Sequence, residues 1–280
     1  MRKISFNAPG KLLLLGDHAA VYGKPCLVAA INKFVTVTVS DNLTKESAFV
    51  AAAKKLFEQK YGPVKSGFKI TGFDSRYGLG SSAAVTVAVA KTMFKLKGIK
   101  PTNKQLFDFC YRVVLNVQGL GSGFDLAATV WRGVIYFVTG GKKIYRLPIE
   151  QLPLVVGYSG VKADTVTMVK KVAARITPGF LNRSTKIVNQ AKILLGQKNW
   201  PVAGELMNQN QKLLKQIGVS TPKLDKLINA SLEAGAYGAK LSGAGGGDCM
   251  IALVAANRRQ VVEQVIARAG GQVLKIRLAL

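Results

Sequence analysis

The sequence predicts an α+β protein of two domains that meet near residue 150. The chain has 280 residues, of which 49% are apolar, so it can bury a large core and has the length of two domains. Strand-like and helix-like segments alternate along its first half. A turn at 139–142 and the prolines Pro148 and Pro153 then indicate a boundary, which divides the chain into residues 1–150 and 151–280.

In the first half, the strongest strand pattern is residues 34–39, FVTVTV, where β-branched residues recur with a period of two. The other elements expected there are helices at 45–60, 81–97 and 103–117 and short strands at 67–73 and 133–138.

The second half has a different order of expected elements. They are a strand at 152–158, a long basic helical region at 162–217, a helix at 222–235, a strand at 249–254, a helix at 257–269 and a strand at 273–278. This order reads βααβαβ, which is an α+β layer arrangement. No fixed repeat period is present, so a solenoid is excluded.

The composition is strongly basic, with forty Lys+Arg against fourteen Asp+Glu and a net charge of +26. Such a field attracts polyanions, nucleotides and acidic membrane surfaces without specifying a fold. The basic residues are scattered and never form a run of five or more. A dedicated nucleic-acid-binding protein is therefore a secondary hypothesis, and a solvated basic surface explains the charge as well as a functional reading does.

The cysteines and the apolar segments favour a soluble cytoplasmic protein. Cys26, Cys110 and Cys249 are far apart and odd in number, as expected of reduced, buried thiols. The four consecutive leucines at 12–15 are too few for a signal peptide or a membrane span. A basic segment at 183–198 could lie on an anionic membrane, but it is explained more simply as a helix with one solvated face.

The tetrapeptide GLGS occurs at 78–81 and again at 119–122. The first copy precedes an apolar helical segment, so free N–H groups and the positive end of a helix dipole form an anion site, with Ser81 as a candidate cap. The segment is not a Walker A loop, and it lacks the preceding strand and following acid of a dinucleotide fold. A simple glycine-rich helix cap remains the alternative.

Three segments read together resemble motifs one, two and three of the GHMP kinase superfamily, which includes galactokinase, homoserine kinase, mevalonate kinase and phosphomevalonate kinase. They are APGKLLLLGDHAAVYGKP at 8–25, GLGSSAA at 78–84 and KLSGAGGGDCMIAL at 240–253. They occur in order and bracket almost the whole chain. The resemblance implies an N-terminal domain like ribosomal protein S5 domain 2, a ferredoxin-like C-terminal domain, and ATP and Mg²⁺ as cofactors.

The same resemblance implies a nucleotide site and a flexible glycine loop. The phosphates would be wrapped by residues 78–83, with the hydroxyl of Ser82 close to Mg²⁺. The loop 243–247 would place backbone N–H groups near the phosphates and the acceptor, although a plain strand–helix turn is the simpler alternative. The residues expected to bind nucleotide are Gly78, Leu79, Gly80, Ser81, Ser82 and Ala83.

The second GLGS copy leads to Asp125, and an acid at a helix start is usually only favoured by the dipole. The resemblance implies more: Asp125 accepts the proton of the attacking hydroxyl, and Lys11 beside it holds the carboxylate ionised. One departure concerns the metal. Mevalonate kinases carry a glutamate eleven residues before this aspartate, and this chain has Val114 there, so Mg²⁺ would rely on Ser82, phosphates and water.

The acceptor is the least determined part of the resemblance. The turn GDHAAVYG at 16–23 is like that of mevalonate kinases, with Asp17 for the usual glutamate, whereas Gln118 and GGGDC at 245–249 are more like phosphomevalonate kinases. We expect mevalonate as the acceptor, with phosphomevalonate as the alternative, in a monomer or homodimer. Lys24 and Lys162 are candidates for its anionic group. The expected substrate-binding residues are Asp17, His18, Tyr22, Ser159, Thr165, Gly243, Ala244 and Gly245.

Overall fold

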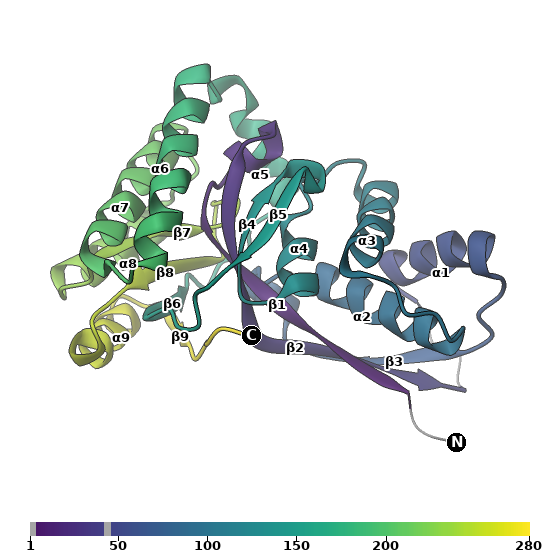
Figure 1. Ribbon diagram of the computed structural model, residues 1–280. Coiled ribbons are helices and arrows are strands. Elements are labelled where there is room, and N and C mark those ends of the chain that lie inside the picture. The colour runs from purple at the N-terminus through teal and green to yellow at the C-terminus, as the bar shows by residue number, and fades with distance from the viewer. Residues whose placement is uncertain (1–3, 42–45) are drawn as a thin grey trace.

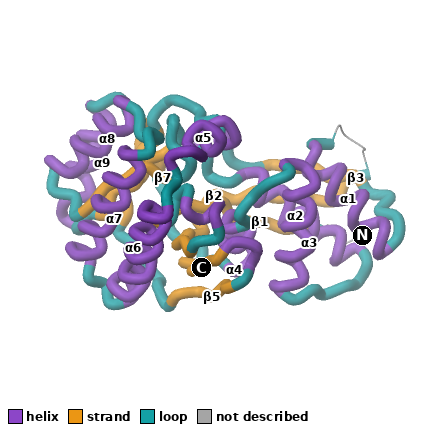
Figure 2. Tube along the Cα trace, turned by 90° about the horizontal axis from the view of Figure 1, so that it is seen from above, coloured by secondary structure: helices purple, strands orange, loops and turns teal. Residues whose placement is uncertain are grey.

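The computed structural model describes residues 4–41 and 46–280 and contains two antiparallel sheets, each covered by helices. Figure 1 shows helices α1–α4 on one side of the molecule and α6–α9 on the other, with the long strands β1 and β2 running between them. In the view from above the same two groups of helices form opposite ends of an elongated molecule (Figure 2). Among the described helices, none combines the length and apolar character needed to cross a membrane.

The first sheet has the strand order β1-β2-β4-β5, and β3 pairs with the far end of β2. Its strands are β1 (Ser5–Leu15), β2 (Pro25–Ser40), β3 (Gly67–Thr71), β4 (Val134–Val138) and β5 (Lys143–Leu147). The helices beside it are α1 (Ala48–Tyr61), α2 (Ser81–Leu96), α3 (Asn103–Gln118) and α4 (Phe124–Trp131). Residue 45, where the first helix was expected to begin, lies outside the described residues.

The second sheet has the order β7-β8-β6-β9. Its strands are β6 (Leu154–Tyr158), β7 (Gly238–Ser242), β8 (Cys249–Leu253) and β9 (Gln272–Leu274). Its helices are α5 (Thr165–Val172), α6 (Pro178–Gly196), α7 (Trp200–Gln216), α8 (Pro222–Glu233) and α9 (Arg259–Arg268).

The four leucines of β1 are all buried because both faces of this strand are covered. Leu12 and Leu14 belong to the core shared with the C-terminal half, whereas Leu13 faces the core under α2 and α4. Side chains alternate across a strand, so a continuous apolar run indicates burial on both faces. Strand β1 therefore joins the two halves, and the turn that follows it lies at their junction.

The predicted βααβαβ order of the second half is wrong. The helical region 162–217 is three helices, since Pro178 and Pro201 lie in the first turns of α6 and α7, where proline is favoured. Strand β7 was missed because it is short and three of its five residues, Gly238, Ala239 and Ser242, are as small as those of the adjacent glycine-rich loop. Strand β5 was missed as well, because it is short and largely exposed.

The strand expected at 273–278 is divided between the two sheets. Residues 272–274 form β9 beside β6, and the chain then crosses to the first sheet, where Leu278 forms a bridge with Ile31. There Ala279 donates its N–H to Ala30 O at 2.9 Å. Periodicity along the chain cannot reveal such a change of partner, because both pieces are extended.

Candidate active site

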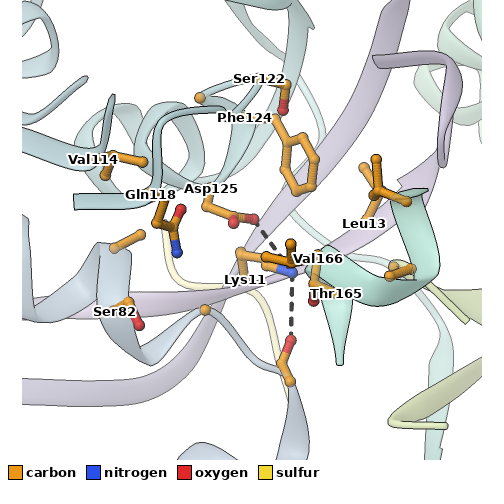
Figure 3. Close-up of a pocket in the computed structure, with 18 of the residues that line it drawn as sticks. Lys11, Leu13, Ser82, Val114, Gln118, Ser122, Phe124, Asp125, Thr165 and Val166 are labelled. Atoms are coloured by element: carbon orange, nitrogen blue, oxygen red, sulfur yellow. Dashed lines mark hydrogen bonds and ion pairs between the residues drawn. The ribbon is translucent and has the colours of Figure 1, made fainter. Parts of the chain in front are cut away.

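A cavity of about 270 Å³ lies at the junction of the two halves. Its wall combines residues from β1 and the turn after it, from both GLGS segments, from the start of α5 and from the loop after β7. Figure 3 shows Asp125 directed toward Lys11 in this wall, with Ser82 at the start of α2 and Thr165 and Val166 of α5 near the tip of Lys11. The three motifs found in the sequence, far apart in the chain, thus meet at one place.

The first GLGS copy opens α2 at this cavity. Gly80, with φ 77°, is the residue that precedes the helix, so Ser81 is the first helical residue and the expected serine cap is wrong. The first backbone bond of the helix is donated by Ala84 to Gly80 O at 3.1 Å. The N–H groups of Ser81, Ser82 and Ala83 therefore have no partner within the helix, and all three residues line the cavity.

The two glycines make room for protein side chains. A Cβ on Gly80 would lie 2.8 Å from Cγ of Lys11, and one on Gly78 would lie 2.2 Å from Oδ2 of Asp248. Leu79 between them is buried in the core, and its carbonyl accepts the N–H of Lys11 at 2.8 Å. The loop is thus fixed by Leu79, while its glycines admit a lysine and an aspartate to the cavity.

The second GLGS copy connects α3 to α4. Gly119 ends α3 with φ 72°, and Gly123 precedes α4 with φ 91°, both in the left-handed region that glycine adopts without penalty. Tyr111 holds the turn between them by donating its hydroxyl to Gly121 O at 2.8 Å. Asp125 consequently lies in the first turn of α4, at the positive end of its dipole.

Lys11 and Asp125 form an ion pair in the cavity wall, with Nζ 3.3 Å from Oδ1 (Figure 3). Lys11 also donates to Gly78 O at 3.3 Å and lies over the ring of Phe124 at 5.4 Å. Its side chain is only 10% exposed, whereas that of Asp125 is 40% exposed. Oδ1 of Asp125 is itself buried and receives no hydrogen bond within the described structure. The lysine is fixed, and the carboxylate is open to a ligand.

The turn after β1 presents His18 to the cavity but not Asp17. His18 adopts φ 60° and lines the cavity, and its Nε2–H donates to Ala244 O at 2.9 Å. Burial lowers the pKa of this imidazole, which favours the neutral ring, and Nδ1 is buried without a partner among the described residues. Asp17 has no exposed surface and does not line the cavity.

Asp17 instead forms a buried ion pair with Lys240 of β7. Oδ2 lies 2.7 Å from Nζ of Lys240, and Oδ1 accepts the N–H of Gly243 at 2.8 Å. Burial lowers the pKa of Lys240, and Asp17 opposes that effect. No role was expected for Lys240, because a lysine in a strand is ordinarily solvated. Asp17 thus supports the glycine loop and does not line the cavity, where it was expected to contact the substrate.

The glycine loop after β7 contributes Gly243 and Ala244 to the wall. Gly245 does not line the cavity, because it packs on Val219, where an added Cβ would lie 2.3 Å from the carbonyl oxygen. The N–H of Gly246 donates to the same carbonyl at 2.8 Å. The expected flexible loop is therefore bonded to its surroundings at several points.

The remaining expected residues fall into two groups. Thr165 and Lys162 line the cavity, whereas Tyr22, Lys24 and Ser159 do not. Tyr22 lies on the outer surface, and Ser159 is buried and exchanges hydrogen bonds with the backbone of Val161. Spacing within a motif places a residue near the site but does not show which way it points.

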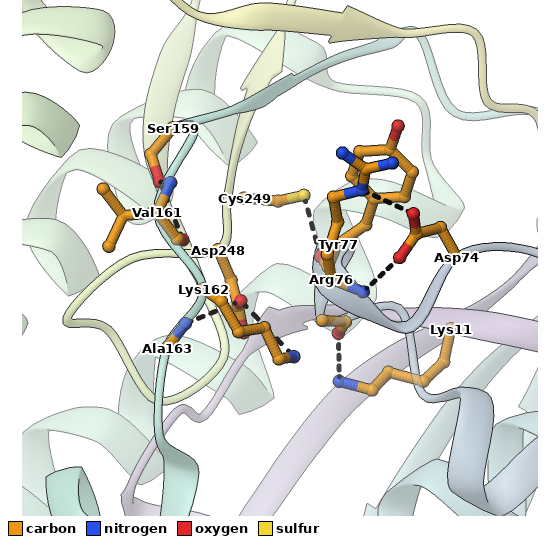
Figure 4. A network of polar contacts seen from close by, with 11 residues as sticks. Lys11, Asp74, Arg76, Tyr77, Ser159, Val161, Lys162, Ala163, Asp248 and Cys249 are labelled. Carbon is orange, nitrogen blue, oxygen red and sulfur yellow. Dashed lines mark hydrogen bonds and ion pairs between the residues drawn. The ribbon is translucent and has the colours of Figure 1, made fainter.

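Asp248 is a cavity residue that the sequence analysis missed. It adopts φ 57°, and its Oδ1 accepts the N–H of Ala163 at 3.0 Å and lies 3.6 Å from Nζ of Lys162 (Figure 4). Its position directly after three glycines indicates a polar residue in an unusual backbone conformation. This pattern could have identified Asp248 from the sequence. Val114 and Gln118 also line the cavity, so no carboxylate stands at either position.

The sequence matches two family models, the GHMP kinases N terminal domain over residues 47–133 and GHMP kinases C terminal over residues 191–272. It is 36% identical to a mevalonate kinase of Thermococcus gammatolerans over 320 aligned positions, covering 96% of this chain and 94% of that protein. A mevalonate kinase of Pyrococcus horikoshii is 34% identical, covering 95% and 92%.

The fold is also similar to solved structures. The Streptococcus pneumoniae phosphomevalonate kinase superposes with a TM-score of 0.89, at 23% identity and 99% coverage of both chains. At that identity the likeness shows the fold, and the sequence matches at 34–36% identity show the family. Together with the two family models, they establish that this chain belongs to the GHMP kinase family.

Proposed function

We propose that this chain transfers the γ-phosphoryl group of ATP to the primary hydroxyl of mevalonate, giving 5-phosphomevalonate and ADP. The observation that carries the proposal is the Lys11–Asp125 pair, which faces the same cavity as the unpaired N–H groups of α2. Relatives named mevalonate kinase, 32–36% identical over nearly the whole chain, support the choice of acceptor.

In the proposed reaction, the acceptor oxygen attacks the γ-phosphorus and its proton passes to the carboxylate of Asp125. The bond from the γ-phosphorus to the bridging oxygen breaks, and ADP leaves. Lys11 pairs with the carboxylate and offsets negative charge near the transferred group. Phosphoryl transfer depends mainly on positioning and electrostatic stabilisation, and a fixed ammonium next to an open carboxylate supplies both.

The residues 78–83 serve as the nucleotide site in this proposal. The N–H groups of Ser81, Ser82 and Ala83 would hold phosphate oxygens at the positive end of α2. His18 would contact the acceptor, because its unpartnered Nδ1 can accept a hydrogen bond from an alcohol. Gly243, Ala244 and Thr165 would complete the acceptor side.

The donor set also suits a magnesium ion carried in with the nucleotide. Ser82 lines the cavity in the first turn of α2, where its hydroxyl can reach an ion bound to the phosphates. Mg²⁺ commonly keeps several waters and binds few protein groups. Ser82 would hold the ion, which when bound neutralises phosphate charge.

An assay of ADP release tests the proposal. Purified chain is given MgATP and, in separate reactions, millimolar mevalonate, phosphomevalonate, homoserine or galactose. We expect the highest kcat/KM with mevalonate. If phosphomevalonate were the better substrate, the proposed acceptor would change but the phosphoryl-transfer chemistry would not. Gln118 in the cavity wall would favour that result. No turnover with any of the four would contradict the proposal.

A further inference from the structure

Two lysines belong to the described cavity wall, Lys11 and Lys162, and they differ in freedom. Lys11 is engaged by Asp125, by Gly78 O and by the ring of Phe124. Lys162 has 52% of its side chain exposed and reaches only Asp248, across a long 3.6 Å separation. Lys162 is thus the cation of the wall that can take a new partner without leaving the cavity.

The backbone that carries Lys162 is held firmly by Asp248. The N–H of Asp248 donates to Val161 O at 2.7 Å, its carbonyl accepts the N–H of Ser159 at 2.9 Å, and its Oδ1 accepts the N–H of Ala163 at 3.0 Å. Figure 4 shows Asp248 between this loop and the segment leading to Gly78. The base of Lys162 is therefore fixed while its tip is loosely held.

Asp248 reaches this place only through an unusual backbone. Its φ of 57° is uncommon for a residue other than glycine, and strained residues of this kind cluster at functional sites. The carboxylate also lies so close to Gly78 that a Cβ there would meet Oδ2 at 2.2 Å. Asp248 therefore connects the loop of Lys162 to the GLGS loop that opens α2.

We propose that Lys162 recognises the anionic group of the acceptor and that it exchanges Asp248 for that group when the acceptor binds. The inference rests on the proposed function, because it assigns a residue to the acceptor of that reaction. An acceptor carboxylate in a cavity that also holds Asp125 and the ATP phosphates needs a cation beside it. Because Lys162 already pairs with the carboxylate of Asp248, its ammonium group has a defined position before the acceptor binds.

Lys162→Met tests the assignment, with Lys24→Met as the matched control, since Lys24 is a nearby lysine outside the cavity wall. Mevalonate binding is measured by calorimetry without nucleotide, and KM values are measured for mevalonate and for ATP. We expect Lys162→Met to weaken mevalonate binding about tenfold to a hundredfold, as for a hydrogen bond to a charged group. The KM of Lys162→Met for ATP should stay within about twofold of the parent value. The Lys24→Met variant should keep its mevalonate binding and both KM values within the same range.

The neutral analogue 3-methylpentane-1,3,5-triol, which replaces the carboxylate by an alcohol, isolates the charge. The triol should bind the parent and Lys162→Met equally. Asp248→Asn keeps an oxygen for Ala163 N–H and tolerates a positive φ, so this variant should bind mevalonate at least as tightly as the parent. Weaker binding by Asp248→Asn would contradict the exchange of partners.

The two proposals can fail separately. If the parent phosphorylated mevalonate but Lys162→Met bound it as tightly as the parent, the role of Lys162 alone would be overturned. If the parent bound mevalonate in a Lys162-dependent way but transferred no phosphoryl group, the proposed reaction alone would be overturned.

Discussion

Among the described residues, three lysine–aspartate pairs lie at or beside one cavity, and two of them differ most clearly in the burial of the aspartate. Lys11 and Asp125 lie 3.3 Å apart with the carboxylate 40% exposed, whereas Lys240 and Asp17 lie 2.7 Å apart with no exposed surface. Each pair includes a residue of the motif at 8–25, Lys11 in one pair and Asp17 in the other. Their surroundings, and not their residue types, leave one carboxylate open to a ligand and bury the other beside a loop.

The difference follows from what each pair can do when a ligand arrives. A carboxylate at a cavity wall can lose a contact and gain another, because the ligand replaces the missing partner. A carboxylate in the interior has no such replacement, and an unpaired buried charge is costly. Asp17 therefore stays with Lys240 and Gly243 N–H, and in doing so it sets the position of the loop that carries Gly243 and Ala244.

The open pair is tested by Asp125→Asn, which should produce the largest effect. An amide cannot accept the hydroxyl proton, so we expect kcat to fall by about 10²–10⁴-fold, the range for a positioned general base. Nucleotide binding should persist, because the N–H groups of α2 are unchanged. Steady-state kinetics and a nucleotide-binding titration measure the two quantities.

Asp108→Asn is the matched control for that experiment. Asp108 is an exposed acid on α3 that pairs with Lys104 at 2.6 Å and does not line the cavity. Its variant should keep parental kcat. An Asp125→Asn chain as active as the parent would remove Asp125 from the proposed mechanism.

The closed pair is tested by Lys240→Met, whose main effect should be on stability. The change leaves Asp17 buried without its cation, so the free energy of unfolding should fall by about 3–5 kcal/mol. The double variant Asp17→Asn with Lys240→Met removes both charges, keeps an oxygen for Gly243 N–H, and should recover most of the loss. Urea denaturation measures all three chains.

Lys215→Met serves as the exposed control. Lys215 pairs with Asp225 at 2.9 Å, but its side chain is 65% exposed, and a surface ion pair contributes less than about 1 kcal/mol. Equal losses for Lys240→Met and Lys215→Met would show that burial does not distinguish the two pairs. A double variant as unstable as Lys240→Met would show that the lost charge pairing is not the cause.

The comparison also explains how far the sequence could predict this molecule. The motifs predicted the family from local spacing, and the resemblance to that family implied the meeting of Lys11 with Asp125, which are far apart in the chain. The α+β class was expected both from the order of the elements and from the resemblance. Asp17 was expected at the acceptor, yet it points away from the cavity. The direction of a side chain in a turn depends on a distant partner, here Lys240 on β7, and no local pattern contains that information.

Asp248 and the strand order show the same limit. Asp248 reaches the cavity only because β8 pairs with β6 and brings the loop 159–163 beside it. The pairing of Leu278 with Ile31 joins segments from opposite ends of the chain. Composition and periodicity describe what a segment prefers, whereas these contacts are decided by which segments share a sheet.

The smallest expected effect concerns pH and His18, which joins the turn beside Asp17 to the glycine loop. Burial lowers the pKa of His18 in the folded chain relative to the unfolded chain. The unfolded state then binds more protons, so folding stability is complete above the unfolded value of about 6.5 and declines as pH falls below it. His18 is the only histidine, so this component can be assigned to it.

Urea denaturation at several pH values between 8 and 5 compares the parent with His18→Gln. The glutamine amide can still donate to Ala244 O but does not titrate in this range. We expect the parent to lose more unfolding free energy than the variant as pH falls, by less than the Lys240→Met loss. Identical pH profiles would mean that the imidazole is not buried as a neutral ring, and the turn after β1 would then be open to water.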